Sequence, residues 1–188
     1  MTSSVIRPVL CLGFGNPSRG DDGAGPAVID ALSRYELPSR LELLAAHQLL
    51  PEFSERFADS DWVVLLDADA RQPAGVITRI RVRPAETCVG GHRWTAASLA
   101  FLAMELHGRC GSVIAYTIGG ADFSATEPWK FTLTPRVAEA VDRLAARLIK
   151  RAAIVDDETR YHPNRRPRGR LATADGSSAL SSAFQSGG

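Results

Sequence analysis

The sequence predicts an α/β fold, a three-layer sandwich in which helices flank both faces of a largely parallel central sheet. Residues 1–151 alternate short apolar runs, typical of strands buried on both faces, with longer segments in which apolar residues recur at helical spacing. Strands that alternate with helices of about 10–15 residues are characteristic of parallel sheets between two helical layers. In such sheets, binding sites form just beyond the carboxyl ends of the strands.

Five segments are expected to be strands and four to be helices. Residues 75–82 (GVITRIRV) alternate in polarity and are rich in β-branched side chains, which indicates a half-exposed strand near an edge of the sheet. The helices carry apolar residues on one face, as Val137, Val141 and Leu144 do in the last one. The expected strands are 9–12, 41–44, 62–66, 75–82 and 112–117, and the expected helices are 24–35, a segment around 49–57, 94–106 and 135–151.

The composition is that of an ordinary globular protein with one domain core. The 188 residues are 45% hydrophobic, and 22 Lys and Arg against 21 Asp and Glu leave a formal net charge of +1. This balance provides no basic field, so nucleic-acid binding is not expected. Three cysteines without CxxC spacing indicate neither a disulfide framework nor a cysteine zinc site. Without a recognisable signal peptide or a membrane-spanning run, the protein is expected to be cytoplasmic with no membrane partner. A monomer is the default expectation, and the sequence leaves the oligomeric state open.

The composition changes after residue 151. Residues 152–188 are rich in Arg, Pro, Ser and Gly and contain few large apolar side chains, so they cannot bury enough surface to offset the entropy lost on ordering. We expect residues 1–151 to form one α/β domain and residues 152–188 to form a disordered tail. The arginines of this tail are interpreted as a solvated segment rather than as a site for an anionic partner.

A glycine-rich loop, residues 13–25 (GFGNPSRGDDGAG), follows the first expected strand. It does not match the dinucleotide-binding fingerprint GxGxxG, because Ser18 stands where the third glycine would be. Asp21 and Asp22 lie where the next helix begins, so a phosphate would meet carboxylates there and a cation is the more natural ligand. One of the two can cap the helix, which leaves the other for a functional role. The loop alone does not decide between them.

A second acidic pair follows the third expected strand. Asp67 comes directly after the apolar run 62–66, and Asp69 lies two residues further on. An Asp at such a position often only begins a turn. The preceding run is too apolar for an exposed strand, however, so Asp67 emerges from the core at a carboxyl end and is the preferred candidate of the two.

An imidazole completes the set of candidate ligands. His92 follows a Gly-Gly turn just before the third expected helix, in a loop of the kind in which sites concentrate. His47, which follows the second expected strand, is the rival, whereas His107 lies near the end of a helix and His162 in the tail. Two carboxylates and one imidazole suit a divalent cation such as zinc, nickel, iron or manganese. With only three protein ligands, coordination positions stay open for a substrate.

Four segments together resemble the nickel–iron hydrogenase maturation endopeptidases. They are LGFGNPSRGDDGAGPAVIDAL, DWVVLLDADA, GGHRWTAASLAFLAMEL and FTLTPRVAEAVDRLAARL, and they occur in the family's order over about residues 8–150. The resemblance implies an α/β fold with a twisted central sheet. It also implies a metal site that is the catalytic site, formed by Asp22, the second Asp of the loop pair, with Asp67 and His92.

The resemblance further implies the activity. Enzymes of this family remove a C-terminal extension from the precursor of the hydrogenase large subunit after nickel insertion, and the nickel in the precursor is thought to be the recognition signal. The chain is therefore expected to be a metal-dependent endopeptidase whose partner is the nickel-loaded precursor. The nickel would come from this substrate, and other divalent metals would occupy the site in vitro. Neither HExxH nor GxSxG occurs, so an ordinary zincin or serine hydrolase is not expected, and the three cysteines are interpreted as non-catalytic.

Several features depart from the family. Asp22 stands where some members carry Glu, and residues 45–52 and 119–123 differ from the loops of many relatives, which leaves the identity of the precursor open. The sequence also leaves open whether Asp22 and Asp67 both bind the metal or one of them acts as general base. One alternative is a non-cleaving, nickel-sensing checkpoint or chaperone that binds the precursor with the same ligands. Another is a flavodoxin-like or nucleotide-binding domain that uses the glycine loop, against which the acidic pair argues.

Overall fold

The computed structural model describes residues 7–86, 94–124 and 132–161, with residues 152–161 described by their backbone alone. The strands are β1 (Val9–Phe14), β2 (Leu41–Ala46), β3 (Trp62–Asp69), β4 (Ile77–Val82) and β5 (Ser112–Gly119). They form one sheet in the order β2-β1-β3-β5-β4. The first four strands in this order are parallel, and β4 pairs with β5 in the antiparallel sense. The largely parallel sheet is therefore confirmed.

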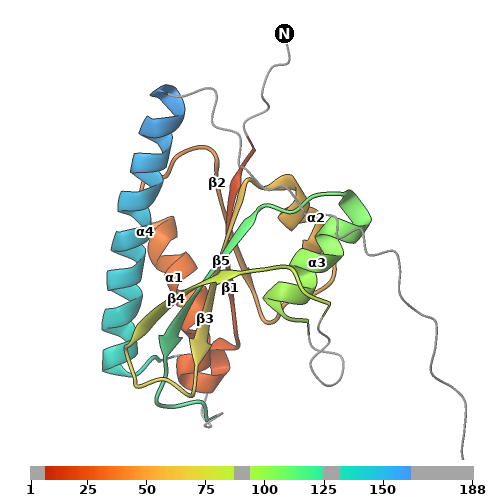
Figure 1. Cartoon of the computed structure of the whole chain (residues 1–188). Coiled ribbons are helices and arrows are strands. Elements are labelled where there is room, and N and C mark those ends of the chain that lie inside the picture. Colours follow the sequence, from red (N-terminus) through yellow and green to blue (C-terminus); the bar gives the residue numbers. More distant parts are fainter. Residues whose placement is uncertain (1–6, 87–93, 125–131, 162–188) are drawn as a thin grey trace, which may run out of the picture.

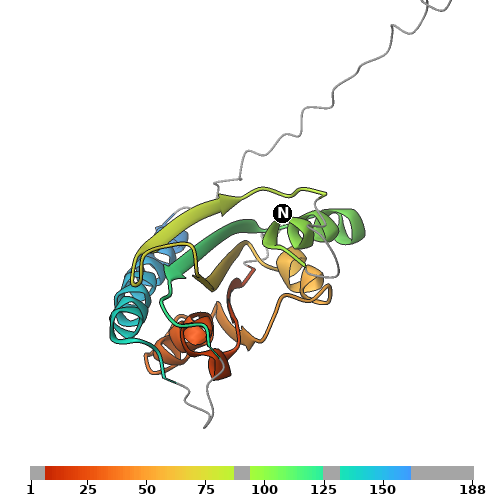
Figure 2. The ribbon, with the colours of Figure 1, turned by 90° about the horizontal axis from the view of Figure 1, so that it is seen from below.

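Helices cover both faces of the sheet (Figure 1). Helices α1 (Ala24–Ser33) and α4 (Pro135–Tyr161) lie on one face, and α2 (Phe53–Asp59) and α3 (Ala96–His107) lie on the other. Seen from below in Figure 2, the sheet is a curved layer between the two pairs of helices. The three-layer α/β sandwich predicted from the alternation of apolar runs and amphipathic segments is confirmed.

Neighbouring residues of each central strand enter different hydrophobic cores. Leu66 of β3 packs in the core under α1 and α4, whereas Leu65 packs in the core under α2 and α3. Their exposed fractions are 0% and 1%, respectively. Burial on both faces explains why this segment is apolar without alternation. In contrast, β4 is an edge strand and Ile80 is 51% exposed, as the alternation of residues 75–82 predicts.

The strands extend further toward the carboxyl edge of the sheet than expected. β1 continues past residue 12 to Phe14, and β3 continues past residue 66 to Asp69. Asp67 and Asp69 are therefore the last acidic residues of a strand rather than the first residues of a loop. This places their backbone in the hydrogen-bonded sheet, where Asp67 pairs with Thr117 of β5.

The last helix is also longer than expected. α4 runs past Arg151 to Tyr161, so the expectation that residues 152–161 belong to a disordered tail is wrong for this segment. No Gly or Pro interrupts the sequence between Pro135 and Pro163, so no helix breaker opposes the continuation of α4, and extending an existing helix costs less than nucleating a new one. Residues 162–188 lie outside the described residues. In the part of the chain that the structure describes, no helix combines the length and the apolar character needed to span a bilayer.

Candidate active site

The candidate site lies at the edge where the parallel strands end. β1 leads into a short 3-10 segment, η1 (Pro17–Gly23), which carries Asp22 and is followed by α1. Gly13 of β1 pairs with Leu66 of β3, so Asp67 lies one residue beyond this pair. Both predicted carboxylates therefore come from chain segments at the junction of β1, β3 and the start of α1, where sheets of this topology form sites.

Two glycines allow these segments to approach one another. A Cβ atom on Gly25, at the start of α1, would lie 2.3 Å from the carbonyl oxygen of Leu66. Gly15 has a φ of +138°, and a Cβ atom there would lie 1.9 Å from the carbonyl oxygen of Asp22. Neither contact leaves room for a side chain, which gives the glycine-rich loop a packing role. It holds the backbone at Asp22 against the end of β1 and the start of α1 against β3 beside Asp67.

Asp22 is a partly exposed residue at this junction. Its Oδ2 atom accepts a hydrogen bond from the backbone N–H of Asn16 at 3.1 Å. Asn16 in turn caps η1, because its Oδ1 atom accepts the N–H of Ser18 at 3.0 Å. The turn thus orients the Asp22 carboxylate through one oxygen. The role of Asn16 was not anticipated, although an Asn before a Pro is a usual turn and cap signal.

Asp21, the other member of the loop pair, is fully buried and serves the fold. Its Oδ2 atom accepts the N–H groups of Ala121 at 2.8 Å and Asp122 at 3.0 Å. Thr134 donates its N–H to Oδ1 at 2.7 Å and its hydroxyl to Oδ2 at 2.9 Å. Burial alone would raise the pKa of Asp21, but these donors stabilise the anion and the pKa is lowered. Asp21 therefore ties η1 to the segment after β5 and to the start of α4, and it does not cap α1, whose N-cap is Gly23.

In the second acidic pair, Asp67 and Asp69, it is Asp69 that makes several structural hydrogen bonds. Asp69 accepts hydrogen bonds from the Arg71 backbone N–H at 2.9 Å, from the Arg71 Nε at 3.0 Å and from the Gln72 side chain at 3.0 Å. These contacts, the Arg71 side chain first, lower the pKa of Asp69 to about 2. Asp67 is partly buried, and one of its contacts is the N–H of Ala68, which donates to Oδ1 at 2.8 Å. Asp69 thus stabilises the turn that follows β3.

Replacing Asp69 with Asn is expected to reduce the free energy of unfolding by about 1 kcal/mol at pH 7, because the Arg71 side chain that it binds is largely exposed. The pKa of Asp69 is lowered from 3.8 to about 2 on folding. Its contribution is therefore complete above the unfolded value and is lost as the pH falls through the folded value. Urea unfolding at a series of pH values measures this. A stability difference between wild type and variant that did not shrink between pH 4 and 2 would contradict the assignment.

His92 lies outside the described residues, but both flanks of its segment are fixed to α3. Before the segment, Ala85 donates its N–H to the carbonyl of Ala97 at 3.2 Å. After it, Thr95 caps α3 through a reciprocal hydrogen-bond pair with Ser98. Trp94 packs in the core that also takes up Phe14 and Ala46, the last residues of β1 and β2. The chain therefore re-enters the fold at the carboxyl edge of the sheet.

The other histidines and the cysteines of the described residues lie away from the two candidate carboxylates or are poor nucleophiles. His47 is exposed and directly follows β2, which borders β1 but not β3. Its backbone is thus about two strand spacings, or roughly 10 Å, from that of Asp67. His107 is exposed at the far end of α3. Burial raises the pKa of the Cys11 thiol to about 12 and that of Cys110 to about 11, which disfavours the nucleophilic thiolate and agrees with their non-catalytic interpretation. Cys88 lies outside the described residues.

Of the three predicted ligands, Asp22 and Asp67 are among the residues that the structure describes and His92 is not. Within residues 7–86, 94–124 and 132–161, no group of three His, Cys, Asp or Glu side chains could hold a metal ion. The predicted site of Asp22, Asp67 and His92 includes a residue outside these ranges, so it stays a prediction. The donor set, two oxygen ligands and one nitrogen ligand, suits a divalent transition metal.

The arrangement of helices and strands is shared with solved hydrogenase maturation proteases. The NiFe hydrogenase maturation protease HycI from Thermococcus kodakarensis matches with a TM-score of 0.64 and 18% identity, over 80% of this chain and 95% of that chain. The hydrogenase maturating endopeptidase HybD from E. coli matches with a TM-score of 0.63 and 20% identity, over 80% of this chain and 93% of that chain. A hydrogenase 2 maturation peptidase from a Thaumarchaeota archaeon matches with a TM-score of 0.57 and 20% identity, over 77% and 97%.

No family model matches the chain, and no curated protein matches it by sequence. The likeness is carried by the three-dimensional arrangement, and it extends over nearly the whole length of the solved proteins. The resemblance inferred from the four sequence segments is therefore confirmed at the level of the fold.

Proposed function

We propose that the chain is an endopeptidase that removes the C-terminal extension of a nickel–iron hydrogenase large-subunit precursor after nickel insertion. The shared fold supports this activity, and so does the family resemblance of the segments that carry the candidate residues. The observation on which the proposal rests is that the backbone segments of Asp22 and Asp67 meet at the carboxyl edge of the sheet, where Gly15 and Gly25 allow their close approach. Asp21 and Asp69 are held by structural hydrogen bonds, and Asp22 and Asp67 are their partly exposed neighbours at the carboxyl edge.

The proposed chemistry uses a metal ion that arrives with the substrate. Nickel in the precursor would be recognised by Asp22, Asp67 and His92. A divalent ion at such a site polarises a carbonyl oxygen or lowers the pKa of a bound water. Asp22 is oriented through one oxygen by the N–H of Asn16, which leaves the other oxygen for the ion or for a water proton. One of the two carboxylates would act as general base if it does not ligate.

Incubation of the pure protein with nickel-loaded and nickel-free precursor tests this proposal. Mass spectrometry of the precursor is expected to show loss of the C-terminal extension only in the nickel-loaded sample. An intact precursor that forms a stable complex with the protein would instead favour the non-cleaving checkpoint. Cleavage of both samples at equal rates would contradict nickel-dependent recognition while leaving the protease activity in place.

A further inference from the structure

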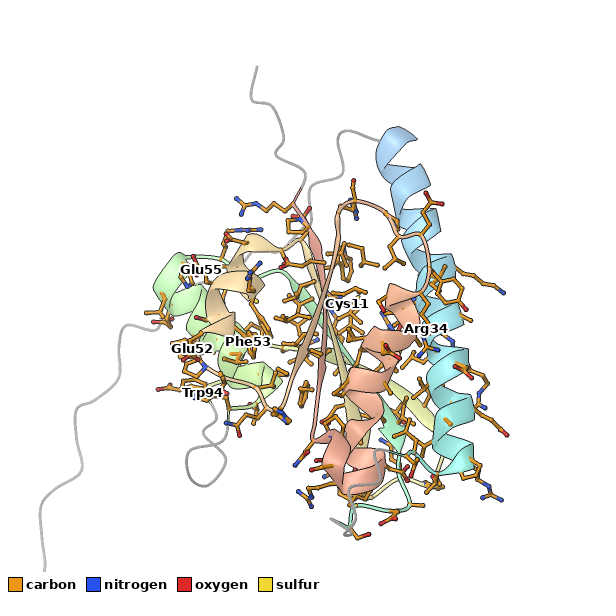
Figure 3. The ribbon with its side chains drawn as sticks, turned by 180° about the vertical axis from the view of Figure 1, so that it is seen from behind. Cys11, Arg34, Glu52, Phe53, Glu55 and Trp94 are labelled. Carbon is orange, nitrogen blue, oxygen red and sulfur yellow. The ribbon has the colours of Figure 1, made fainter. Side chains whose placement is uncertain are left out.

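A cavity lies at the end of the sheet where the parallel strands begin, away from the candidate active site. Cys11, one of its lining residues, lies on the face of the sheet opposite Phe53 and Trp94 (Figure 3). The cavity has a volume of about 430 Å³. The cavity exists because α1 ends at Ser33, so the first residues of β1, β2 and β3 are left uncovered beside α4. Val64, the β3 residue of the lining nearest to Asp67, is three residues from it along the strand, or roughly 10 Å, and the alternation of β3 places Val64 and Asp67 on side-chain rows of opposite faces. The cavity is thus separate from the candidate active site.

The walls of the cavity are apolar. They are formed mainly by side chains of the three central strands and α4, among them Cys11, Val64, Tyr116 and Leu148. Cys11 is 3% exposed and Tyr116 is 2% exposed, so these side chains form a firm floor rather than a mobile surface. A pocket of this size with such walls is in the range that takes up small organic ligands.

The charged residues at the cavity are all arginines. Arg40, Arg79 and Arg151 line it, and among the described residues no Asp or Glu does. Arg79 lies directly opposite Tyr116 in the β4–β5 register, which places it beside the apolar floor. Arg79 and Arg151 have no ion-pair partner within the described part of the chain. Guanidinium groups bind carboxylates through paired hydrogen bonds, so the cavity is complementary to an organic anion.

We propose that this cavity binds a monocarboxylic acid with an unbranched apolar tail, a medium-chain fatty acid. The tail would replace water on the apolar floor and the carboxylate would meet Arg79 and Arg151. The chain's own residues 162–188 are a poor occupant by charge, because they carry Arg165, Arg166, Arg168 and Arg170 against a single acidic residue, Asp175. The proposal is independent of the protease activity.

Calorimetric titration of the full-length protein with octanoate, decanoate and decylamine tests the proposal. Decanoate is expected to bind about 15-fold more tightly than octanoate, because two further methylene groups are buried. Decylamine, which has a similar tail and the opposite charge, is expected to bind at least tenfold more weakly than decanoate. Absence of saturable decanoate binding, or equal binding of the amine, would overturn the proposal.

Substitutions at residues that line the cavity test whether decanoate binds there. The double substitution Arg79→Gln and Arg151→Gln is expected to weaken decanoate binding about tenfold. The control pair Arg83→Gln and Arg147→Gln, which removes the same charge from exposed positions outside the cavity, is expected to leave it unchanged. Val64→Phe, checked for folding by circular dichroism, would narrow the cavity at its floor and is expected to weaken decanoate binding. Equal effects of the two arginine pairs would overturn the proposal. Binding that appears only after removal of residues 162–188 would assign the cavity to that segment instead.

Discussion

Asp22→Asn and Asp67→Asn are each expected to slow processing of the nickel-loaded precursor at least about a thousandfold, which corresponds to about 4 kcal/mol of transition-state stabilisation. Asn has nearly the shape of Asp but is neutral, so it weakens a metal ligand and cannot accept a proton as a general base. Both residues are partly exposed, and Asn keeps the size of the Asp side chain and an oxygen that can accept the N–H of Asn16 at position 22 and of Ala68 at position 67. The fold should therefore survive both substitutions, as thermal unfolding would show.

The neighbouring residues provide matched controls for this experiment. Asp69→Asn removes the same charge two residues from Asp67, and it is expected to lower stability while processing continues. Asp22→Glu keeps a carboxylate at the loop and is expected to retain measurable processing, since the resemblance places Glu at this position in some relatives. Wild-type rates in Asp22→Asn or in Asp67→Asn would remove that residue from the proposed chemistry.

Asp21→Ala is expected to reduce the free energy of unfolding by about 3–4 kcal/mol, a larger effect than that of Asp69→Asn. The substitution leaves the N–H groups of Ala121, Asp122 and Thr134 without their acceptor in a fully buried site. The melting temperature should fall by roughly 10 °C. Calorimetry or circular dichroism measures this directly.

The pH dependence of the stability loss in Asp21→Ala shows whether the loss comes from the missing carboxylate anion or from a packing defect. Because the pKa of Asp21 is lowered on folding, its contribution is complete above its unfolded value and is lost as the pH falls through its folded value. The stability difference between wild type and Asp21→Ala should therefore shrink as the solution is acidified below about pH 4. A difference that is constant with pH, or smaller than about 1 kcal/mol at pH 7, would contradict the proposed tether.

The sequence predicted the layers and the carboxyl-edge location because both depend on local patterns. Apolar runs such as residues 62–66 identify buried strands, and the chain beyond them has to emerge at the edge. The choice between Asp21 and Asp22 could not be made from local chemistry. The partners of Asp21 lie 100, 101 and 113 residues away in the sequence, so only the folded chain reveals which carboxylate they bind.

The end of α4 was missed for a different reason. Residues 156–160 (DDETR) are polar, and composition alone assigned them to the tail. Helix propagation depends on the turns already packed and on the absence of a breaker, and the first breaker after Pro135 is Pro163. Composition therefore describes whether a segment can form a core by itself, but it does not describe whether a neighbouring helix continues into it.

The central claim is that residues 22, 67 and 92 act on one cation. Titration of the full-length protein with Ni²⁺, followed by calorimetry and native mass spectrometry, tests it most directly. The account predicts one ion per chain, bound at least tenfold more weakly after Asp22→Asn, Asp67→Asn or His92→Ala, and bound as in wild type after His47→Ala or Asp69→Asn. Wild-type affinity in any of the first three variants, or a loss caused by His47→Ala in place of His92→Ala, would contradict it.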